Sequence, residues 1–375
     1  MAILTKVPVA LLILILVFLV YLVMVKARIS TSFRDVLLFS GVLIITGSSW
    51  FILQMIDGNA HIIRDFIIYQ IRLFKTEDAG HGGFFMYHFV VLFFGVFPAS
   101  VFALPALFRS ILEFYRSKSF GLWMRILFWT VLILFSIVDT KIVHYSSLAY
   151  FPLTFMAAKV IFRIIQEKRV FYKYQKILLV LISFAYSMLT VALVLLGRIK
   201  DTLPLEKWID DPFALANLQA EVDWPLLLIL IGTIYFAVTL YILFGCKRIT
   251  PRIIGIFSAT LLFTYSTILF ITPRIEAYSQ RAAIEFYKSI EDEDAYVATL
   301  GFKSYAHLYY SKVKPPGDIK AGETEWLMTG NTDKPVYAVF KVNRKEKYLS
   351  QYPLLEVIGE KNGFVFTKRK TDDSR

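Results

Sequence analysis

Four groups of polar residues lie where this apolar chain would meet water, and their side-chain types could do chemistry. The first is Lys6, just before a long apolar run, and the second is the charged stretch that ends at His81. The third is DTKIVHY at residues 139–145, and the fourth is the acidic segment 201–223. Lysine and arginine side chains held together can bind a phosphate and stabilise it as a leaving group.

The first three groups are expected at one depth of a membrane, on the same side. The cations Lys6, Arg72, Lys75 and Lys141 could then converge on one anion, and a lipid phosphate is available at that depth. Each cation also has a structural interpretation, either as a span-end lysine that extends to the interface or as a solvated loop charge. Only the coincidence of the three groups favours a binding site.

Histidines offer a second kind of chemistry, because imidazole is a common metal ligand. His81 and His144 could contribute to a divalent metal site, although they lie in separate loops, and structural roles are the alternative. The sequence assigns no cofactor otherwise. Gly80, Gly82 and Gly83 flank a histidine and do not lead from a strand into a helix, so they do not indicate a phosphate-binding glycine loop.

The composition places these residues in a membrane protein. The 375 residues are 57% apolar, the mean hydropathy is +0.59, and several runs approach the ~20 residues that cross a bilayer as a helix. The net charge of +12 comes from basic loops between apolar runs, which argues against nucleic-acid binding. The single cysteine, Cys246, excludes an intrachain disulfide and a cysteine metal site.

Hydropathy predicts a polytopic all-α membrane domain of about eight spans. The spans are expected at 8–25, 36–56, 86–108, 122–138, 147–164, 177–197, 225–245 and 253–272. The loops 26–35, 109–121, 165–176 and 246–252 are the more basic set, so the positive-inside rule places them in the cytoplasm. The alternate loops, with His81 and Trp208, then face outward. Trp50, Trp208 and Trp224 would form an aromatic belt at outer span ends.

Two further elements follow from periodicity. Residues 58–78 predict an interfacial helix, since His61, Asp65 and Arg72 share one helical face. After residue 273 the composition changes, and 274–375 predict a small extracytoplasmic α/β domain, separate from the transmembrane domain 1–273. Helices are expected at 276–293, 305–311 and 343–350, and strands at 295–300, 335–342, 354–359 and 364–368. Ala283, Tyr287 and Ile290 are expected to face inward.

Three motifs resemble those of lipid-linked-sugar glycosyltransferases, of the protein mannosyltransferase and bacterial aminoarabinose-transferase types. LTKVPVALLI resembles the family's LTKGPVALLLP, and residues 68–106 resemble an RF pair followed by GHGGPFYYY, PWS and LP. DTKIVHYSSLAYFPLTFMAA resembles KTKLPHYxLPLYPALALL. The motifs cover about residues 1–160, in the family's order. Val7 replaces a glycine, Arg72 stands one place from the RF register, and Ala99 replaces the tryptophan of PWS.

This resemblance implies a GT-C fold and a transferase that moves a sugar from a polyprenyl-phosphate carrier to an extracytoplasmic acceptor. It implies a multi-pass protein of the bacterial inner membrane, with the C-terminal domain outside the cytoplasm. Lys6, His81, Lys141, His144 and Tyr145 match family motif residues. The resemblance implies phosphate binding for the lysines and site architecture for the histidines and the tyrosine.

The resemblance also implies that an acidic residue is missing. Family members open with more spans, and their first outer loop carries the carboxylate that acts as general base or helps bind a metal. This chain begins at what would be about the sixth span, which is expected of a fragment, of a truncated gene product or of half of a split enzyme. Asp65 and Asp139 are the candidates for a base. A non-catalytic membrane scaffold and a lipid or solute transporter are the alternative functions, and the scarcity of mid-span charge counts against transport.

Overall fold

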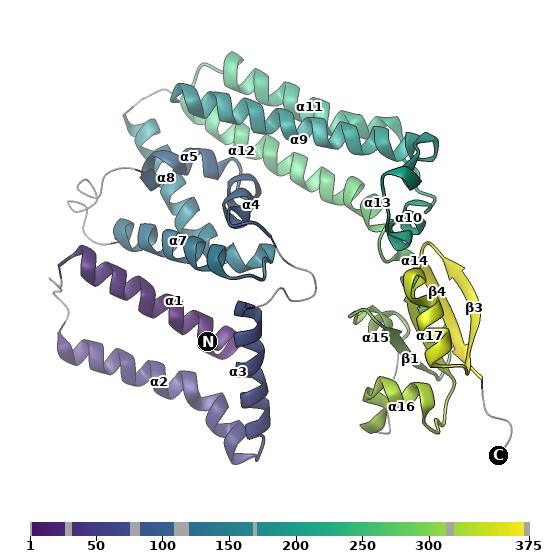
Figure 1. Cartoon of the computed structure of the whole chain (residues 1–375). Helices are drawn as coiled ribbons and strands as arrows, with labels where there is room; N and C mark the ends of the chain where they lie inside the picture. Colours follow the sequence, from purple (N-terminus) through teal and green to yellow (C-terminus); the bar gives the residue numbers. More distant parts are fainter. Residues whose placement is uncertain are drawn as a thin grey trace. The chain divides into compact units, whose positions relative to one another are not determined.

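The structure, a computed structural model, describes residues 2–26, 32–75, 83–108, 120–167, 171–312 and 319–370 (Figure 1). Within these ranges six helical segments are long and apolar enough to cross a membrane, and Val9–Met24 and Ala99–Phe108 are shorter apolar helices. The long segments are Phe33–Ile56, Phe120–Ile137, Val143–Gln166, Lys173–Thr202, Leu226–Gly245 and Ile249–Glu276. The chain is therefore a polytopic α-helical membrane protein with a small C-terminal sheet domain, as the sequence predicts.

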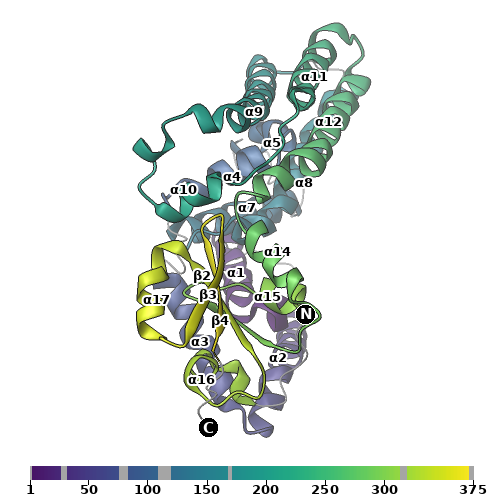
Figure 2. The ribbon, with the colours of Figure 1, turned by 90° about the vertical axis from the view of Figure 1, so that its right-hand side faces the viewer.

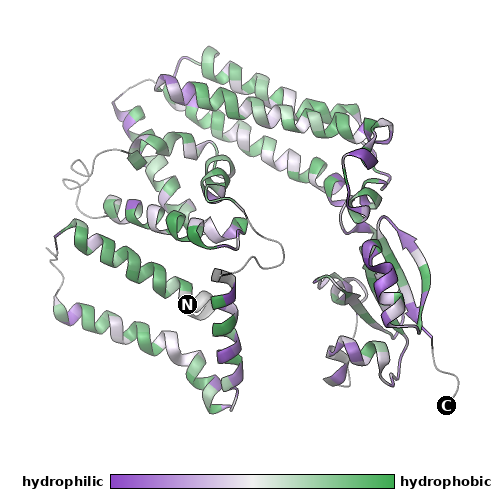
Figure 3. Cartoon of the chain, viewed as in Figure 1, coloured by the Kyte–Doolittle hydropathy of each residue, from purple (hydrophilic) through white to green (hydrophobic). Residues whose placement is uncertain are grey.

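The chain divides into two compact units. The first comprises Met1–Ile182 and Thr239–Thr260, and the second comprises Ser183–Val238 and Leu261–Arg375. The first unit holds the following elements: α1 (Ala2–Met24), α2 (Phe33–Ile56), α3 (Ala60–Lys75), α4 (Tyr87–Gly95), α5 (Ala99–Phe108), α7 (Phe120–Ile137), the 3₁₀ helix η2 (Val143–Ala149) and α8 (Tyr150–Gln166). Figure 3 shows apolar residues around α1, α2 and α7, and more polar residues along α3.

The third predicted span, 86–108, is two helices and not one. Helix α4 ends at Gly95, and α5 begins at Ala99, directly after Pro98. Proline lacks an amide hydrogen and cannot continue the hydrogen-bond ladder of the preceding helix, so the run breaks there. Pro105, in contrast, is accommodated inside α5.

Helix α3 lies within the predicted interfacial segment 58–78 and covers Ala60–Lys75. That it rests on the bilayer surface stays a prediction. The domain boundary after residue 273 also stays a prediction, and α13 (Thr272–Glu276) runs through it.

Two helices approach closely at a glycine of the second unit. Helices α9 (Lys173–Ile199) and α11 (Ile229–Leu240) meet where a Cβ on Gly232 would lie 2.8 Å from the Ser187 carbonyl oxygen. Nearby, the Ser183 and Tyr235 hydroxyls are 3.2 Å apart. Small residues that let helix backbones approach are typical of membrane helix packing.

The chain between α9 and α11 is not a plain acidic loop. It holds η3 (Lys200–Thr202), η4 (Leu205–Lys207), α10 (Pro212–Leu218) and η5 (Leu226–Leu228). Asp211 caps α10, accepting a hydrogen bond from the Phe213 amide at 2.9 Å, and Pro212 occupies the first helical position. After α11 come the π-helical turn η6 (Tyr241–Gly245), α12 (Ile249–Ser266) and a second π-helical turn, η7 (Thr267–Ile271).

Trp224, at the end of the same segment, is buried within the protein, so its predicted place in an aromatic belt is wrong. It is 3% exposed and packs with Val194, Leu228 and Ile271. Its indole Nε1 donates to the Tyr278 hydroxyl at 3.0 Å.

The C-terminal domain is built on a four-stranded sheet in the order β1-β2-β4-β3. Strands β1 (Tyr296–Leu300) and β2 (Val336–Lys341) are parallel, and β4 (Phe364–Arg369) is antiparallel to both β2 and β3 (Leu355–Lys361). Each strand lies within two residues of its predicted range. The turn Asn362–Gly363 joins β3 to β4 with φ values of 45° and 81° at its two residues, which is the signature of a tight hairpin.

Helices cover both faces of this sheet (Figure 2). One face packs against α16 (Thr324–Thr329) and α17 (Lys345–Gln351), through residues such as Leu327 and Phe340. The other packs against α14 (Arg281–Ser289) and α15 (Ala306–Tyr310), through residues such as Tyr287 and Phe366. The short helices η8 (Ile319–Gly322) and η9 (Val342–Arg344) complete the domain.

The predicted helix 276–293 is interrupted. Its central part is α14, which begins at Arg281, and the turn 277–280 separates α14 from α13. The residues expected to face inward, Ala283, Tyr287 and Ile290, are all buried.

Candidate phosphate-binding site

Lys141 closes the C-terminal end of α7. Its ammonium donates to the backbone carbonyls of Ser136 at 2.7 Å, Val138 at 2.5 Å and Phe135 at 3.3 Å. The last carbonyls of a helix have no intrahelical partner, and an ammonium has three donors to offer them. The positive charge also lies at the negative end of the helix dipole. Lys141 therefore folds the segment that follows α7 back onto the helix end.

This lysine is unusually buried for its type, at 5% exposure. Burial lowers the pKa of Lys141 because it disfavours the charged form, and the nearby carboxylate of Asp139 opposes that effect. The carbonyl contacts compensate the desolvation of the ammonium. Since its donors already have partners, Lys141 acts in this conformation through its charge and by holding the chain.

Gly83, the last residue of the GHGG motif, lies directly against Lys141. A Cβ added at Gly83 would be 2.9 Å from Cγ and 3.3 Å from Cβ of Lys141. Glycine is required here because any side chain would push on a stem that is fixed at both ends. The two motifs, more than fifty positions apart in the sequence, are therefore in contact. His81, the residue of GHGG predicted to bind substrate, lies outside the described residues.

His144 and Tyr145 follow Lys141 on η2. The Tyr145 ring packs on Phe135 with a centroid distance of 5.4 Å, and the exposed His144 ring meets the Tyr145 ring edge-to-face at 5.1 Å. Phe135 also supplies one of the carbonyls that Lys141 binds. Lys141, His144 and Tyr145 thus form one cluster at the end of α7.

His88 belongs to the same neighbourhood and is not among the predicted site residues. It is fully buried, between the rings of Tyr87 and Phe135. Neither ring nitrogen has a hydrogen-bond partner within the residues that the structure describes. The only sequence signal for His88 was its position inside the apolar run MYHFVV. That pattern does not distinguish a site histidine from a structural one.

Replacing His88 by leucine is expected not to destabilise the protein. An unsatisfied buried polar group costs about 1–3 kcal/mol, so leucine should raise the unfolding free energy or leave it unchanged. Thermal unfolding of the purified variant beside the parent protein measures this. A lower melting temperature would mean that the imidazole has a partner, and that the site extends to α4.

Lys6 is part of helix α1. The packing of α1 against α7 shows where the Lys6 backbone lies along the length of α7. Tyr21 stacks on Trp123 with a centroid distance of 4.3 Å, and the two helices run in opposite directions (Figure 1). Lys6 precedes Tyr21 by about four turns, and Ile137 follows Trp123 by about four, roughly 21 Å along each helix. The backbone at Lys6 is therefore at the end of α7 that Lys141 closes. Its side chain lies outside the described part of the chain.

The remaining predicted residues are on α3 and after α7. Arg72 is exposed, with its guanidinium 5.1 Å from the Tyr69 ring centroid, and its place beside a shared phosphate stays a prediction. The side chain of Lys75 is outside the described residues. Asp65 is exposed and pairs with Arg64 at 3.3 Å, and Asp139 is exposed beside Lys141. Among the residues described, no group of three or more histidine, cysteine or acidic residues could hold a metal ion.

The fold around this cluster is GT-C-like, the class that the motifs predict. It is shared with two solved structures of ArnT from Cupriavidus metallidurans, one bound to undecaprenyl phosphate and one in the apo state, each with a TM-score of 0.58 and 15% sequence identity. The first match covers 99% of this chain and 67% of the ArnT chain, and the second covers 98% and 66%. This chain thus spans about two thirds of their length. No protein-family model and no curated protein sequence matches it.

Proposed function

We propose that this protein is a glycosyltransferase of the inner membrane of a bacterium, and that its sugar donor is carried on a polyprenyl phosphate. The observation that supports this most is the likeness to ArnT along nearly the whole chain, including a structure bound to undecaprenyl phosphate. The contact between Gly83 and Lys141 adds to it, because it unites two motifs that resemble those of such enzymes.

The proposed reaction is a displacement at the anomeric carbon of the sugar. An acceptor hydroxyl forms the new glycosidic bond, the bond to the carrier phosphate breaks, and the hydroxyl proton passes to a base. The phosphate leaves with the electron pair of the broken bond. Cations already in place stabilise that charge in the transition state.

Each residue has a role in this proposal. Lys6, Arg72 and Lys75 bind the phosphate directly, while Lys141 is a positioning residue whose charge stays at the end of α7. His81, His144 and Tyr145 shape the entrance for the carrier lipid. Asp65 and Asp139 are the candidate bases within this chain, and the acceptor is extracytoplasmic, on the same side as the C-terminal domain.

Replacing Arg72 by alanine is expected to weaken the binding of undecaprenyl phosphate about tenfold, the effect of losing one hydrogen bond to a charged group. Native mass spectrometry of the full chain in nanodiscs, titrated with the lipid, measures the bound fraction. Undecaprenol, which lacks the phosphate, should bind equally to the parent and to the variant.

Arg64→Ala is the matched control, since Arg64 is an exposed arginine on the same helix that pairs with Asp65. It should leave undecaprenyl phosphate binding within about twofold of the parent. Equal losses in both variants would show that α3 contributes only general positive charge. No detectable binding of the phosphate lipid to the parent protein would overturn the proposed function.

A further inference from the structure

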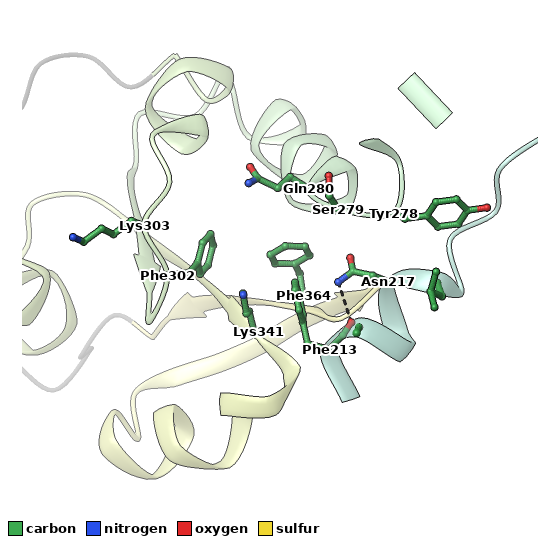
Figure 4. Close-up of a pocket in the computed structure, with 11 residues that line it drawn as sticks. Phe213, Asn217, Tyr278, Ser279, Gln280, Phe302, Lys303, Lys341 and Phe364 are labelled. Atoms are coloured by element: carbon green, nitrogen blue, oxygen red, sulfur yellow. Dashed lines mark hydrogen bonds between the residues drawn. The ribbon is translucent and has the colours of Figure 1, made fainter. Parts of the chain in front are cut away.

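A pocket of about 500 Å³ opens in the second unit, where α10 meets the C-terminal sheet (Figure 4). It is lined from α10, from the turn between α13 and α14, from the chain after β1 and from the adjoining ends of β2 and β4. All of these elements belong to the second unit, whereas the Lys141 cluster belongs to the first. The size falls in the range of small-molecule sites, roughly 300–1,000 Å³.

Three phenylalanines form one connected aromatic surface in this pocket. Phe364 is central, edge-to-face with Phe213 at 5.2 Å and with Phe302 at 5.9 Å between ring centroids. Phe364 is buried, while Phe213 and Phe302 are half-buried and present apolar surface to the pocket. Such rings offer flat apolar contact to a ligand.

Close backbone packing fixes this surface. A Cβ on Gly363, whose φ is +81°, would lie 2.9 Å from Cδ2 and 3.0 Å from the carbonyl oxygen of Phe213. Nearby, the Asn343 side-chain amide donates to Asp211, the cap of α10, at 3.4 Å. The pocket is therefore built by a close fit between α10 and the hairpin.

The pocket is positively charged. The Lys341 ammonium is 4.3 Å from the centroid of the Phe213 ring, and within the described residues it makes no ion pair. Figure 4 shows the Lys341 side chain rising beside the Phe302 and Phe364 rings, while the Lys303 side chain points away from them. None of the described lining residues is acidic. A ligand at this site would gain by bringing a negative charge to Lys341.

Neutral polar groups border the aromatic surface. The side-chain amide of Asn217 donates to the Phe213 carbonyl at 2.9 Å, which leaves its own oxygen as an acceptor. Gln280 is exposed at the opposite border and offers both a donor and an acceptor. These groups suit a ligand that carries hydroxyls.

We propose that this pocket binds an acidic saccharide, with a sugar ring against the Phe302 and Phe364 surface and its phosphate or carboxylate at Lys341. Aromatic rings match the C–H face of a pyranose, amides match its hydroxyls, and a lysine matches its anionic group. The choice of a saccharide as the ligand rests on the proposed transferase function. The aromatic surface and the positive charge of the pocket are independent of that function.

Calorimetric titration of the full chain in nanodiscs tests this, with glucose 6-phosphate, glucose and inorganic phosphate as probes. Glucose 6-phosphate should bind more tightly than glucose or phosphate. Lys341→Gln should weaken its binding about tenfold, the effect of one charged contact, and should leave glucose binding unchanged. Phe302→Ala should weaken both sugars.

Lys347→Gln is the matched control, because that ammonium lies over the Tyr348 ring at 5.6 Å, outside this pocket. It should leave every probe unaffected. A triglutamate peptide, used as a further probe, distinguishes a site for acidic peptides from a site for saccharides. Tighter binding of that peptide, or of phosphate alone, than of glucose 6-phosphate would overturn the proposal. An unchanged Lys341→Gln variant would also overturn it. The glucose 6-phosphate titration contains no carrier lipid, so it is independent of the undecaprenyl phosphate measurement. If the protein binds glucose 6-phosphate but not undecaprenyl phosphate, the proposed function is overturned and the saccharide pocket is not.

Discussion

Replacement of Lys141 by methionine is expected to destabilise the protein by about 3 kcal/mol or more. Methionine keeps most of the apolar stem but removes the ammonium that binds the carbonyls of Phe135, Ser136 and Val138. Those carbonyls would lose charge-assisted hydrogen bonds at a buried helix end. Equilibrium unfolding in mixed micelles measures the loss of stability, and native mass spectrometry measures the loss of undecaprenyl phosphate binding that the proposed function predicts.

Lys173→Met serves as the comparison, because Lys173 is exposed at the start of α9 and the same substitution there should change stability by less than about 0.5 kcal/mol. Lys141→Arg separates the role of the positive charge from the role of the hydrogen bonds to the carbonyls. Arginine restores the charge but not the compact three-donor geometry of the ammonium. If Lys141→Met unfolds like the parent, the ammonium does not hold the end of α7.

Replacement of Gly197 by valine is expected to cost about 3 kcal/mol, because the new side chain would overlap the buried Trp224 indole. A Cβ at Gly197 would lie 2.4 to 2.6 Å from three atoms of the Trp224 indole. The indole is buried and cannot move aside without breaking its hydrogen bond to Tyr278. The variant should show a lower melting temperature and an increase in Trp224 solvent exposure, measured by fluorescence quenching.

Gly41→Val provides the control for this substitution. Gly41 also lies within a helix, but nothing is within 4 Å of a Cβ built there. The variant should therefore be close to the parent in stability. A similar loss in both variants would mean that the cost comes from the helix backbone and not from contact with Trp224.

The sequence predicts most of the sheet domain because its strands are short runs of β-branched and aromatic residues between turns. It misses α10, since a helix of seven residues is too short for apolar periodicity to show. A signal was nevertheless present: Asp211 followed by Pro212 is a typical helix start. Within a polar loop, that pair was indistinguishable from a turn.

The candidate site shows a sharper limit. Its residue types and its motif order could be predicted, but not the partners of Lys141, because these depend on how the chain folds back after Ile137. The contact between Gly83 and Lys141 is long-range and leaves no local pattern. Burial of Trp224 was equally hidden, since tryptophan at a span end suits both a lipid interface and a packed core.

The close fit of α10 on the β3–β4 hairpin also governs how the protein is made. Phe213 leaves the ribosome about 150 residues before Phe364, an interval of roughly 8–30 s at ordinary elongation rates. During that interval the apolar face of α10 has no sheet to cover it. A chaperone, or transient shelter against lipid, would protect this helix until translation reaches β4, and the pocket assembles only after that point.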